Sequence, residues 1–473
     1  MTKRMFARFS MFLKAAVLTV FALAAVACAD YDDKNEIKDS YYAYESALIE
    51  AETLKNYIDN GHRTPDGRKV VIIDVTGTTP AQVIKGALGM PQNNYFTMQR
   101  TDGPVEVGNM VADGAKMDAA IRFAGIDGNT LVVITATNLT TNNIHRVFWT
   151  FKYWGFSNKA VKVLNGANQY FAATYADYME PSGAVNVVPS TFSVKDLPGN
   201  AIDSVRAPLG EIIVDVKAGV YKEDGSGAKI MIPTMPATNT VMSGGVEATK
   251  YANAGAIGGR IKGATQLELP TTANSTAHYL TDDGRYKTPE EIAAAIVTFN
   301  NTPFLPADKN KRIIVHCGGG QSTAPHWFAL REILGYTNAA IYDGSWNEWG
   351  NLTMFKPASA AETFARGTGA TQNSYLTWDW TQNGYIDSVT KGIIAASQLA
   401  NTGFLNADFD TSRLTDWLTF SVTGPSNITY HNDYQGEAKE INEADKNYQQ
   451  NIGGSSAGSS NNAAAGGGAP SGC

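Results

Sequence analysis

One cysteine of this sequence stands at the head of a loop whose residues suit nucleophilic sulfur chemistry. Cys317 follows an apolar run, residues 313–315, that predicts a buried strand. Because glycines let backbone N–H groups converge on one point, the loop can hold a negative charge on sulfur. We therefore predict that Cys317 is a catalytic nucleophile and that the rest of the loop binds an anionic substrate. Those binding residues are Gly318, Gly319, Gly320, Gln321, Ser322 and Thr323.

A helix is predicted directly after this loop. Thr323 is a candidate N-cap, and Pro325 suits the first helical turn. The start of a helix carries positive potential, which favours the thiolate over the thiol. In open α/β sheets, ligands bind beyond the carboxyl ends of the strands, which is where Cys317 would lie.

Two alternative roles for the cysteine stay open. Cys317 could be an inert buried thiol, since cysteine is among the most buried residue types. It could also serve a cysteine-dependent phosphatase, but such a loop needs an arginine at its end, and Ser322, Thr323 and Ala324 stand there. His316 is expected to point away from Cys317, because side chains alternate along a strand. The histidines show no metal-ligand spacing, so we expect no metal and no other cofactor.

The elements that must position this loop recur along the chain. Four pairs of short segments repeat in the same order, namely 71–74 with 212–215, 84–87 with 261–264, 131–134 with 312–315, and 163–166 with 341–344. Most are apolar runs that predict buried strands, with helical patterns between them. Strands that alternate with helices indicate an α/β fold with parallel sheets. The first copy has no cysteine in its loop, residues 135–140, so we expect it to be a structural partner.

Two longer motifs point to a known family. Residues 342–349 are Tyr-Asp-Gly-Ser-Trp-Asn-Glu-Trp, and residues 146–155 are Arg-Val-Phe-Trp-Thr-Phe-Lys-Tyr-Trp-Gly. They resemble the YDGSWxEW and RVWWxxRxxG motifs of the tandem-domain rhodanese family, the thiosulfate and mercaptopyruvate sulfurtransferases. The resemblance implies two tandem, doubly wound α/β domains with parallel sheets. It also implies that Cys317 takes the outer sulfur of a donor such as thiosulfate, carries it as a persulfide, and passes it to a thiol or cyanide.

The cysteine loop departs from this family in its charges. The thiosulfate enzymes carry basic residues inside the loop, and the mercaptopyruvate enzymes carry a serine two residues after the cysteine, where this chain has Gly318 and Gly319. The family's arginine after the first strand of the second domain is replaced by Lys217. Arg260 and Lys262, in a segment that resembles the family's GHIPGA turn, are candidates to bind the substrate anion instead.

The N-terminus resembles a bacterial lipoprotein signal peptide, which we assign to residues 1–27. Lys3, Arg4 and Arg8 precede an apolar stretch that is too short to span a bilayer with ease. The stretch ends in Ala-Val-Ala before Cys28, which is similar to a lipobox and implies lipidation of Cys28. We then expect a lipid anchor in the cell envelope, on the periplasmic or surface face of the outer membrane. The alternative is an ordinary signal peptide with an incidental cysteine.

The rest of the sequence divides into segments of different composition. Cys473 ends a flexible Gly/Ser/Ala tail, and could pair with Cys317 or accept sulfur from it. We expect a tether over 28–45, a first rhodanese-like domain over 46–190, a second over 200–357 with an insertion near 217–256, a C-terminal extension of unknown fold over 358–450, and the tail over 451–473.

Charge and family resemblance together limit the partners. A formal net charge of -7 without a long basic run disfavours nucleic acid, because phosphate binding needs a basic face. The leading hypothesis is an envelope sulfurtransferase whose partners are a small sulfur-containing anion and a thiol or cyanide acceptor. The alternative is a non-catalytic or oxyanion-handling lipoprotein, for example one for selenite, that serves an outer-membrane redox complex.

Overall fold

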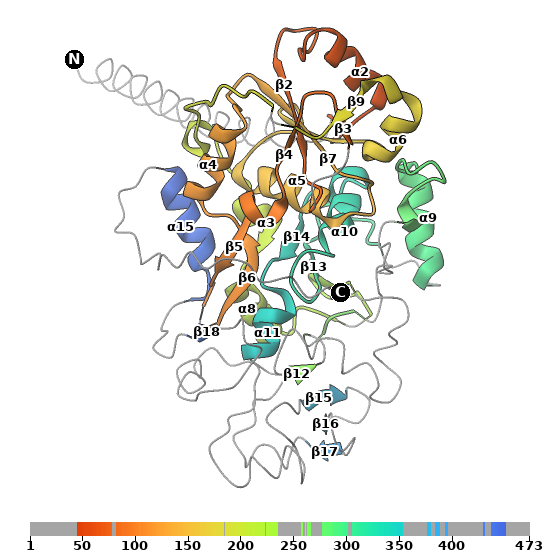
Figure 1. Ribbon diagram of the computed structural model, residues 1–473. Coiled ribbons are helices and arrows are strands. Elements are labelled where there is room, and N and C mark those ends of the chain that lie inside the picture. The colour runs from red at the N-terminus through yellow and green to blue at the C-terminus, as the bar shows by residue number, and fades with distance from the viewer. Residues whose placement is uncertain are drawn as a thin grey trace, which may run out of the picture. The chain divides into compact units, whose positions relative to one another are not determined.

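The structure is a computed structural model, and the part of the chain that it describes contains two parallel sheets and their helices (Figure 1). The described residues from Ala47 onward belong to one compact unit. Among the described residues, no helix is long and apolar enough to cross a membrane. The described residues are 45–77, 82–103, 105–183, 185–222, 224–234, 257–258, 261, 263–265, 277–300, 305–352, 376–379, 384–387, 393–395, 429–430 and 437–450.

The first sheet has five parallel strands in the order β1-β8-β7-β2-β4. Strand β2, which lies between β7 and β4, is apolar on both faces, and its side chains alternate between two separate cores. Val71 and Ile73 belong to the core shared with α4 and α5, whereas Val70 and Ile72 face α2 and α6. The elements are β1 (Leu48–Ile49), α2 (Ala51–Asp59), β2 (Lys69–Asp74), β4 (Ala87–Gly89), α3 (Gln92–Tyr95), α4 (Gly114–Phe123), β7 (Thr130–Thr135), α5 (Asn142–Trp154), β8 (Val161–Leu164) and α6 (Ala167–Thr174).

The second sheet has four parallel strands in the order β10-β14-β13-β11, which matches the first four strands of the first sheet. Two strand pairs show the correspondence: Ile73 lies beside Ile134 in the first sheet, and Ile232 lies beside Val315 in the second. The elements are β10 (Arg206–Ala207), α8 (Leu209–Ala218), β11 (Ile230–Pro233), α9 (Pro289–Asn300), β13 (Ile313–His316), α10 (Ala324–Phe328) with a π-helical continuation η5 (Ala329–Ile333), β14 (Ala339–Tyr342) and α11 (Ser345–Leu352).

One predicted strand is wrong. Residues 212–215 lie in helix α8, and the strand that corresponds to β2 is β11. A short apolar run does not by itself distinguish a strand from a buried helix. Here the helix extends over ten residues and ends at Gly219, whose φ of 64° suits a helix terminus. Lys217 is therefore a helix residue, and the predicted insertion near 217–256 includes a core strand.

Most other predicted elements are confirmed. The strands around 71–74, 131–134, 163–164, 313–315 and 341–342 are present. Thr288 and Glu291 form a capping box at the start of α9, since Thr288 N–H donates to the Glu291 carboxylate (2.9 Å) and Glu291 N–H donates to Thr288 Oγ1 (3.3 Å). Helix α2 begins at Ala51 and not earlier, because Leu48 and Ile49 pair with β8.

The remaining elements are small. The predicted extension over 358–450 contributes strands to two small sheets and ends in helix α15 (Glu440–Gln449). The other elements are β3 (Gln82–Ile84) with β9 (Met179–Pro181); β5 (Thr97–Arg100) with β6 (Val105–Val111) and β18 (Thr429–Tyr430); β12 (Ile257–Gly258) with β15 (Leu376–Asp379), β16 (Gly384–Asp387) and β17 (Ile393–Ala395); α7 (Ile202–Val205); and the short 3-10 helices η1 (Ala176–Tyr178), η2 (Val194–Asp196) and η4 (Ala277–Tyr279).

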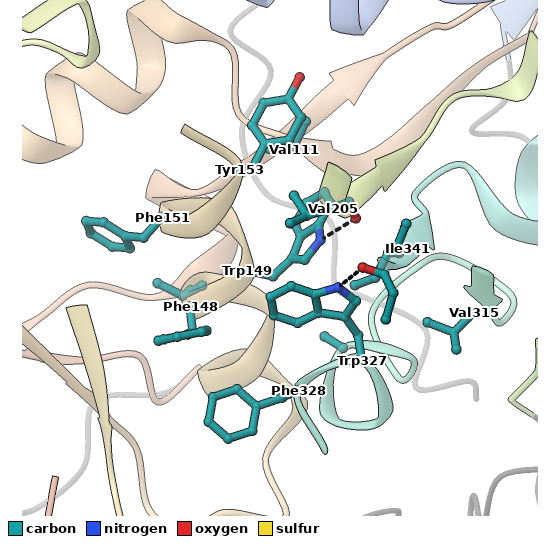
Figure 2. Close-up of a cluster of buried hydrophobic side chains, with 14 of the residues drawn as sticks. Val111, Phe148, Trp149, Phe151, Tyr153, Val205, Val315, Trp327, Phe328 and Ile341 are labelled. Carbon is teal, nitrogen blue, oxygen red and sulfur yellow. Dashed lines mark hydrogen bonds between the residues drawn. The ribbon is translucent and has the colours of Figure 1, made fainter. Parts of the chain in front are cut away.

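Helix α5 of the first copy packs against α10 of the second through aromatic side chains (Figure 2). Every residue from Ile144 to Trp154 is buried, so this helix is covered on all sides. Phe148 meets Phe328 edge to face at 5.1 Å between ring centroids. The indole N–H groups of Trp149 and Trp327 donate to backbone carbonyls at 3.0 and 2.9 Å. The two sheets thus share one core.

Candidate active site

Cys317 lies where the sequence predicts it, directly beyond the carboxyl end of β13 and before α10. Its side chain is buried, with 1% of its surface exposed. The sulfur accepts the backbone N–H of Gly320 at a distance of 3.2 Å. A hydrogen-bond donor aimed at sulfur stabilises negative charge on that atom.

The start of helix α11 holds this loop from the other side. Trp346 N–H donates to the carbonyl of Cys317 (3.0 Å), and Asn347 N–H donates to that of Gly318 (2.8 Å). Ser345 Oγ accepts the N–H of Cys317 (3.2 Å) and donates to the carbonyl of Tyr342 (2.8 Å). The motif at residues 342–349 therefore holds the cysteine loop in place through hydrogen bonds.

The three glycines of the loop have different roles. Gly320 has a φ of 76°, and a Cβ there would lie 2.4 Å from the carbonyl oxygen of Asp343. Only glycine fits such a left-handed backbone pressed against another backbone atom. Gly319 has no positive φ and is half-buried, and its added Cβ would approach only the Asn347 side chain, at 3.0 Å. Gly318 is buried and accepts from Asn347.

The rest of the predicted binding loop leads into α10. Gln321 is half-buried and its carbonyl accepts Ala324 N–H (3.0 Å), while Ser322 Oγ lies 3.5 Å from Asn142 Nδ2 of α5. Thr323 occupies the N-cap position as predicted, but its side chain makes no capping hydrogen bond. Its helical φ and ψ of -82° and -19° differ from the extended backbone that a capping side chain needs. Pro325 lies in the first turn as predicted.

A cluster of buried charges lies behind the loop. The Asp343 carboxylate pairs with Arg146 and also with Arg206, whose Nε is 3.4 Å away. Burial alone would raise the pKa of Asp343, but the two guanidinium groups hold it below its ordinary value. Arg206 also pairs with Asp102 at 2.8 Å and donates to Asn442 Oδ1 of α15 at 2.8 Å.

Two further ionisable groups near the site are buried. Burial and the neighbouring Asp102 raise the pKa of Glu348 well above its ordinary value. His316 is buried, and its Nδ1 lies 3.3 Å from the carbonyl oxygen of Cys317, a backbone contact that fits a structural role.

The first copy has no thiol at the equivalent place. Val75 N–H donates to the carbonyl of Thr135 (2.9 Å), and Thr234 N–H donates to that of His316 (2.7 Å), which aligns Ala136 with Cys317. The first copy therefore cannot form a persulfide at its sheet edge.

Some predicted residues lie outside the described part of the chain, and some important residues were not predicted. Cys28, Cys473, Arg260 and Lys262 all lie outside it. Among the described residues, no group of histidine, cysteine, aspartate and glutamate side chains could hold a metal ion. Arg146 was missed as a contact of the loop, although a charged residue between the apolar residues of a buried helix is a signal that it has a buried partner.

Comparisons with known proteins point to one family. The rhodanese-like domain family matches residues 247–352, which include the cysteine loop. A protein of Haloferax volcanii named "Putative thiosulfate sulfurtransferase" is 25% identical over 321 residues, which are 67% of this chain and 97% of that protein. The "Sulfur carrier protein TtuD" of Thermus thermophilus is 28% identical over 241 residues, 50% of this chain and 74% of that protein. Among solved structures, the Tum1 protein from Saccharomyces cerevisiae has a TM-score of 0.48 at 17% identity, and the match covers 64% of this chain and 94% of that one.

Proposed function

We propose that this chain is a rhodanese-like sulfurtransferase in which Cys317 carries the sulfur, since residues 247–352 match the rhodanese-like domain family. The observation that carries the proposal is the Gly320 N–H aimed at the Cys317 sulfur at 3.2 Å. An inert buried cysteine needs no such donor, whereas a sulfur that must bear a charge gains from one. The names of the relatives support sulfur transfer as the reaction class.

The proposed reaction has two displacement steps. The Cys317 thiolate attacks the outer sulfur of thiosulfate, a new S–S bond forms, and sulfite leaves with the electron pair of the bond that breaks. The terminal sulfur of the persulfide now carries the negative charge. A thiophilic acceptor, a thiolate or cyanide, then attacks this sulfur and releases the Cys317 thiolate. No redox cofactor is consumed in this cycle.

The backbone of the loop is the proposed binding site for the charged sulfur. The N–H of Gly320 is the hydrogen-bond donor to Cys317 Sγ. Gly319 and Gln321 are half-buried and are the most exposed residues of the loop. Because glycines supply no side-chain charge, the donor anion must rely on backbone N–H groups and on charges brought by other segments. Arg260 stays our candidate for such a charge.

The experiment that tests this function is a thiosulfate:cyanide transfer assay with the purified protein and its Cys317→Ser variant. The expected result is thiocyanate production that depends on Cys317. Absence of transfer by the wild type with thiosulfate and with mercaptopyruvate would contradict the proposal and favour the oxyanion-handling alternative.

We also propose that the protein works in the cell envelope, held there by lipid on Cys28. The support is the resemblance of residues 25–28 to a lipobox. Two signals are usually needed for stable anchoring, and a lipidated N-terminal cysteine carries more than one acyl chain. Fractionation of cells that express Cys28→Ala should show the protein released from membranes; retention after a high-salt wash would contradict the anchor.

A further inference from the structure

The guanidinium of Arg146 lies behind the cysteine loop, although Arg146 belongs to α5 of the first copy. Its Nη1 donates to the carbonyl of Gly320 at 3.2 Å. Its Nη2 donates to the carbonyl of Asn109 at 2.9 Å and to the carboxylate of Asp343. The side chains of Arg146 and Asp343 are fully buried. One side chain thus joins the first copy, the loop and the Tyr-Asp-Gly-Ser-Trp motif.

Gly320 is the residue through which this contact reaches the sulfur. Its carbonyl is held by Arg146, and its N–H is the donor to Cys317 Sγ. With its left-handed φ of 76° and its close approach to the Asp343 carbonyl, Gly320 has little room to shift. The carbonyl and the N–H of Gly320 belong to adjacent peptide units that meet at its Cα, so holding the carbonyl restricts the backbone torsions that set the direction of the N–H.

The arginine itself is held in one orientation. Its guanidinium stacks over the Trp149 ring, with 4.4 Å between the guanidinium carbon and the ring centroid. Asp343, its ionic partner, is fixed in turn by Val111 N–H at 2.9 Å. A planar group with several N–H donors can meet two carbonyls and a carboxylate at once, which the compact ammonium of a lysine does not reproduce.

We propose that Arg146 is a positioning residue for Cys317: by holding the Gly320 carbonyl, it aims the Gly320 N–H at the sulfur. This inference rests on the proposed function for its benefit to sulfur transfer. It gives the cysteine-less copy a direct part in the chemistry of the other copy. Arg146 does not touch the reacting atoms; it acts through Gly320.

The test compares Arg146→Lys and Arg146→Gln with a matched control, Arg312→Lys. Arg312 also joins a carboxylate and backbone carbonyls, through Glu211 (2.8 Å) and Ser204 (2.8 Å), but it precedes β13, at the opposite end of that strand from Cys317. The readouts are the rate of Cys317 alkylation by iodoacetamide and the rate of persulfide formation from thiosulfate. Both are measured where circular dichroism shows each variant to be folded.

We expect both Arg146 variants to slow alkylation and persulfide formation by about tenfold or more, since a misaligned donor loses much of its effect on the charged sulfur. Arg312→Lys should change both rates by less than about twofold. Equal rates in the Arg146 and Arg312 variants would overturn the proposal. So would failure of both Arg146 variants to fold while Arg312→Lys folds, because that result assigns Arg146 a purely structural role.

The two readouts separate this inference from the proposed function. If the wild type takes no sulfur from thiosulfate, the proposed function fails for that donor. The alkylation rates still decide whether Arg146 controls the reactivity of Cys317, because iodoacetamide needs no sulfur donor.

Discussion

The two copies place different chemistry at the same edge of equivalent sheets. In the first copy the edge is closed by its own side chains: Asn168 Nδ2 donates to Asp74 (2.7 Å), and Thr135 donates to Asn168 Oδ1 (2.8 Å). In the second copy the equivalent edge holds Cys317, whose sulfur accepts a backbone N–H. In the first copy these side chains hydrogen-bond to one another, and the loop has no thiol that could act as a nucleophile. Under the proposed function, the first copy stabilises the structure and the second carries out the chemistry.

The helices that follow these two loops differ in regularity. Helix α5 of the first copy is regular over 13 residues and ends at Gly155, with a φ of 102°. Helix α10 of the second copy is α-helical for only 5 residues before it becomes a π-helix, a form that is often found at functional sites. The regular helix is the one that supplies the shared aromatic core and Arg146.

The largest expected effect separates the two loops by their nucleophile. Cys317→Ser should abolish sulfur transfer while the protein stays folded, because serine cannot form a persulfide. Ala136→Cys in that background places a thiol at the equivalent position of the first copy and should not restore transfer, since its loop has threonine and asparagine instead of glycines. Thiocyanate production measures both. Recovery of activity in the double variant would show that the loop backbone is not what matters.

The next effect distinguishes two glycines of the reactive loop. Gly320→Ala puts a Cβ against the Asp343 carbonyl and into a left-handed backbone that costs alanine about 1–2 kcal/mol. We expect it to lower kcat/KM by about tenfold to a hundredfold, because the donor to sulfur shifts. Gly319→Ala, the control, should cost much less. A larger loss from the Gly319 variant would contradict the role of Gly320.

The shared core contains one buried histidine from each copy, and the two make the stability of the protein depend on pH. Burial lowers the pKa of His145 and of His326 to about 3, and for His326 the proximity of His145 adds to this. Unfolded histidines bind protons below about pH 6.5, and the folded protein does not until about pH 3, so stability is lost as the pH falls through this window. Since one pKa unit corresponds to about 1.4 kcal/mol, the loss should reach several kcal/mol.

Urea unfolding of the wild type and of His326→Gln measures this loss. Tyr279 O–H lies 2.9 Å from His326 Nδ1, so glutamine keeps a polar partner for it but no longer titrates. The variant should lose less stability than the wild type between about pH 6.5 and about pH 4. Parallel curves for the two proteins would mean that His326 does not stay neutral when folded.

The smallest expected effect concerns the charge cluster beside the reactive loop. Because the pKa of Glu348 is raised by burial and by Asp102, its carboxyl group holds a proton in the folded protein that the unfolded chain releases. Stability that is present below about pH 4.5 is therefore lost as the pH rises. Glu348→Gln should remove this loss and gain on the order of 1 kcal/mol at about pH 8 by urea unfolding. A less stable variant at that pH would mean that Glu348 is ionised and paired.

The sequence predicted the reactive loop better than it predicted the sheet that carries it. Cys317, its glycines and Pro325 lie as expected, because a strand, glycines and a helix start are encoded by neighbouring residues. The strand at 230–233 was missed, since four apolar residues in a presumed insertion carry little signal beside the longer run in α8. The contacts of Arg146 and Asp343 join residues 197 positions apart, and no local pattern encodes them.

Whether Cys317 carries sulfur can be read from the intact mass of the protein after incubation with thiosulfate. We expect the wild type to gain the mass of one sulfur atom, a reducing thiol to remove it, and Cys317→Ser to gain nothing. An unchanged wild-type mass, or an equal gain in Cys317→Ser, would show that this cysteine is not the sulfur carrier.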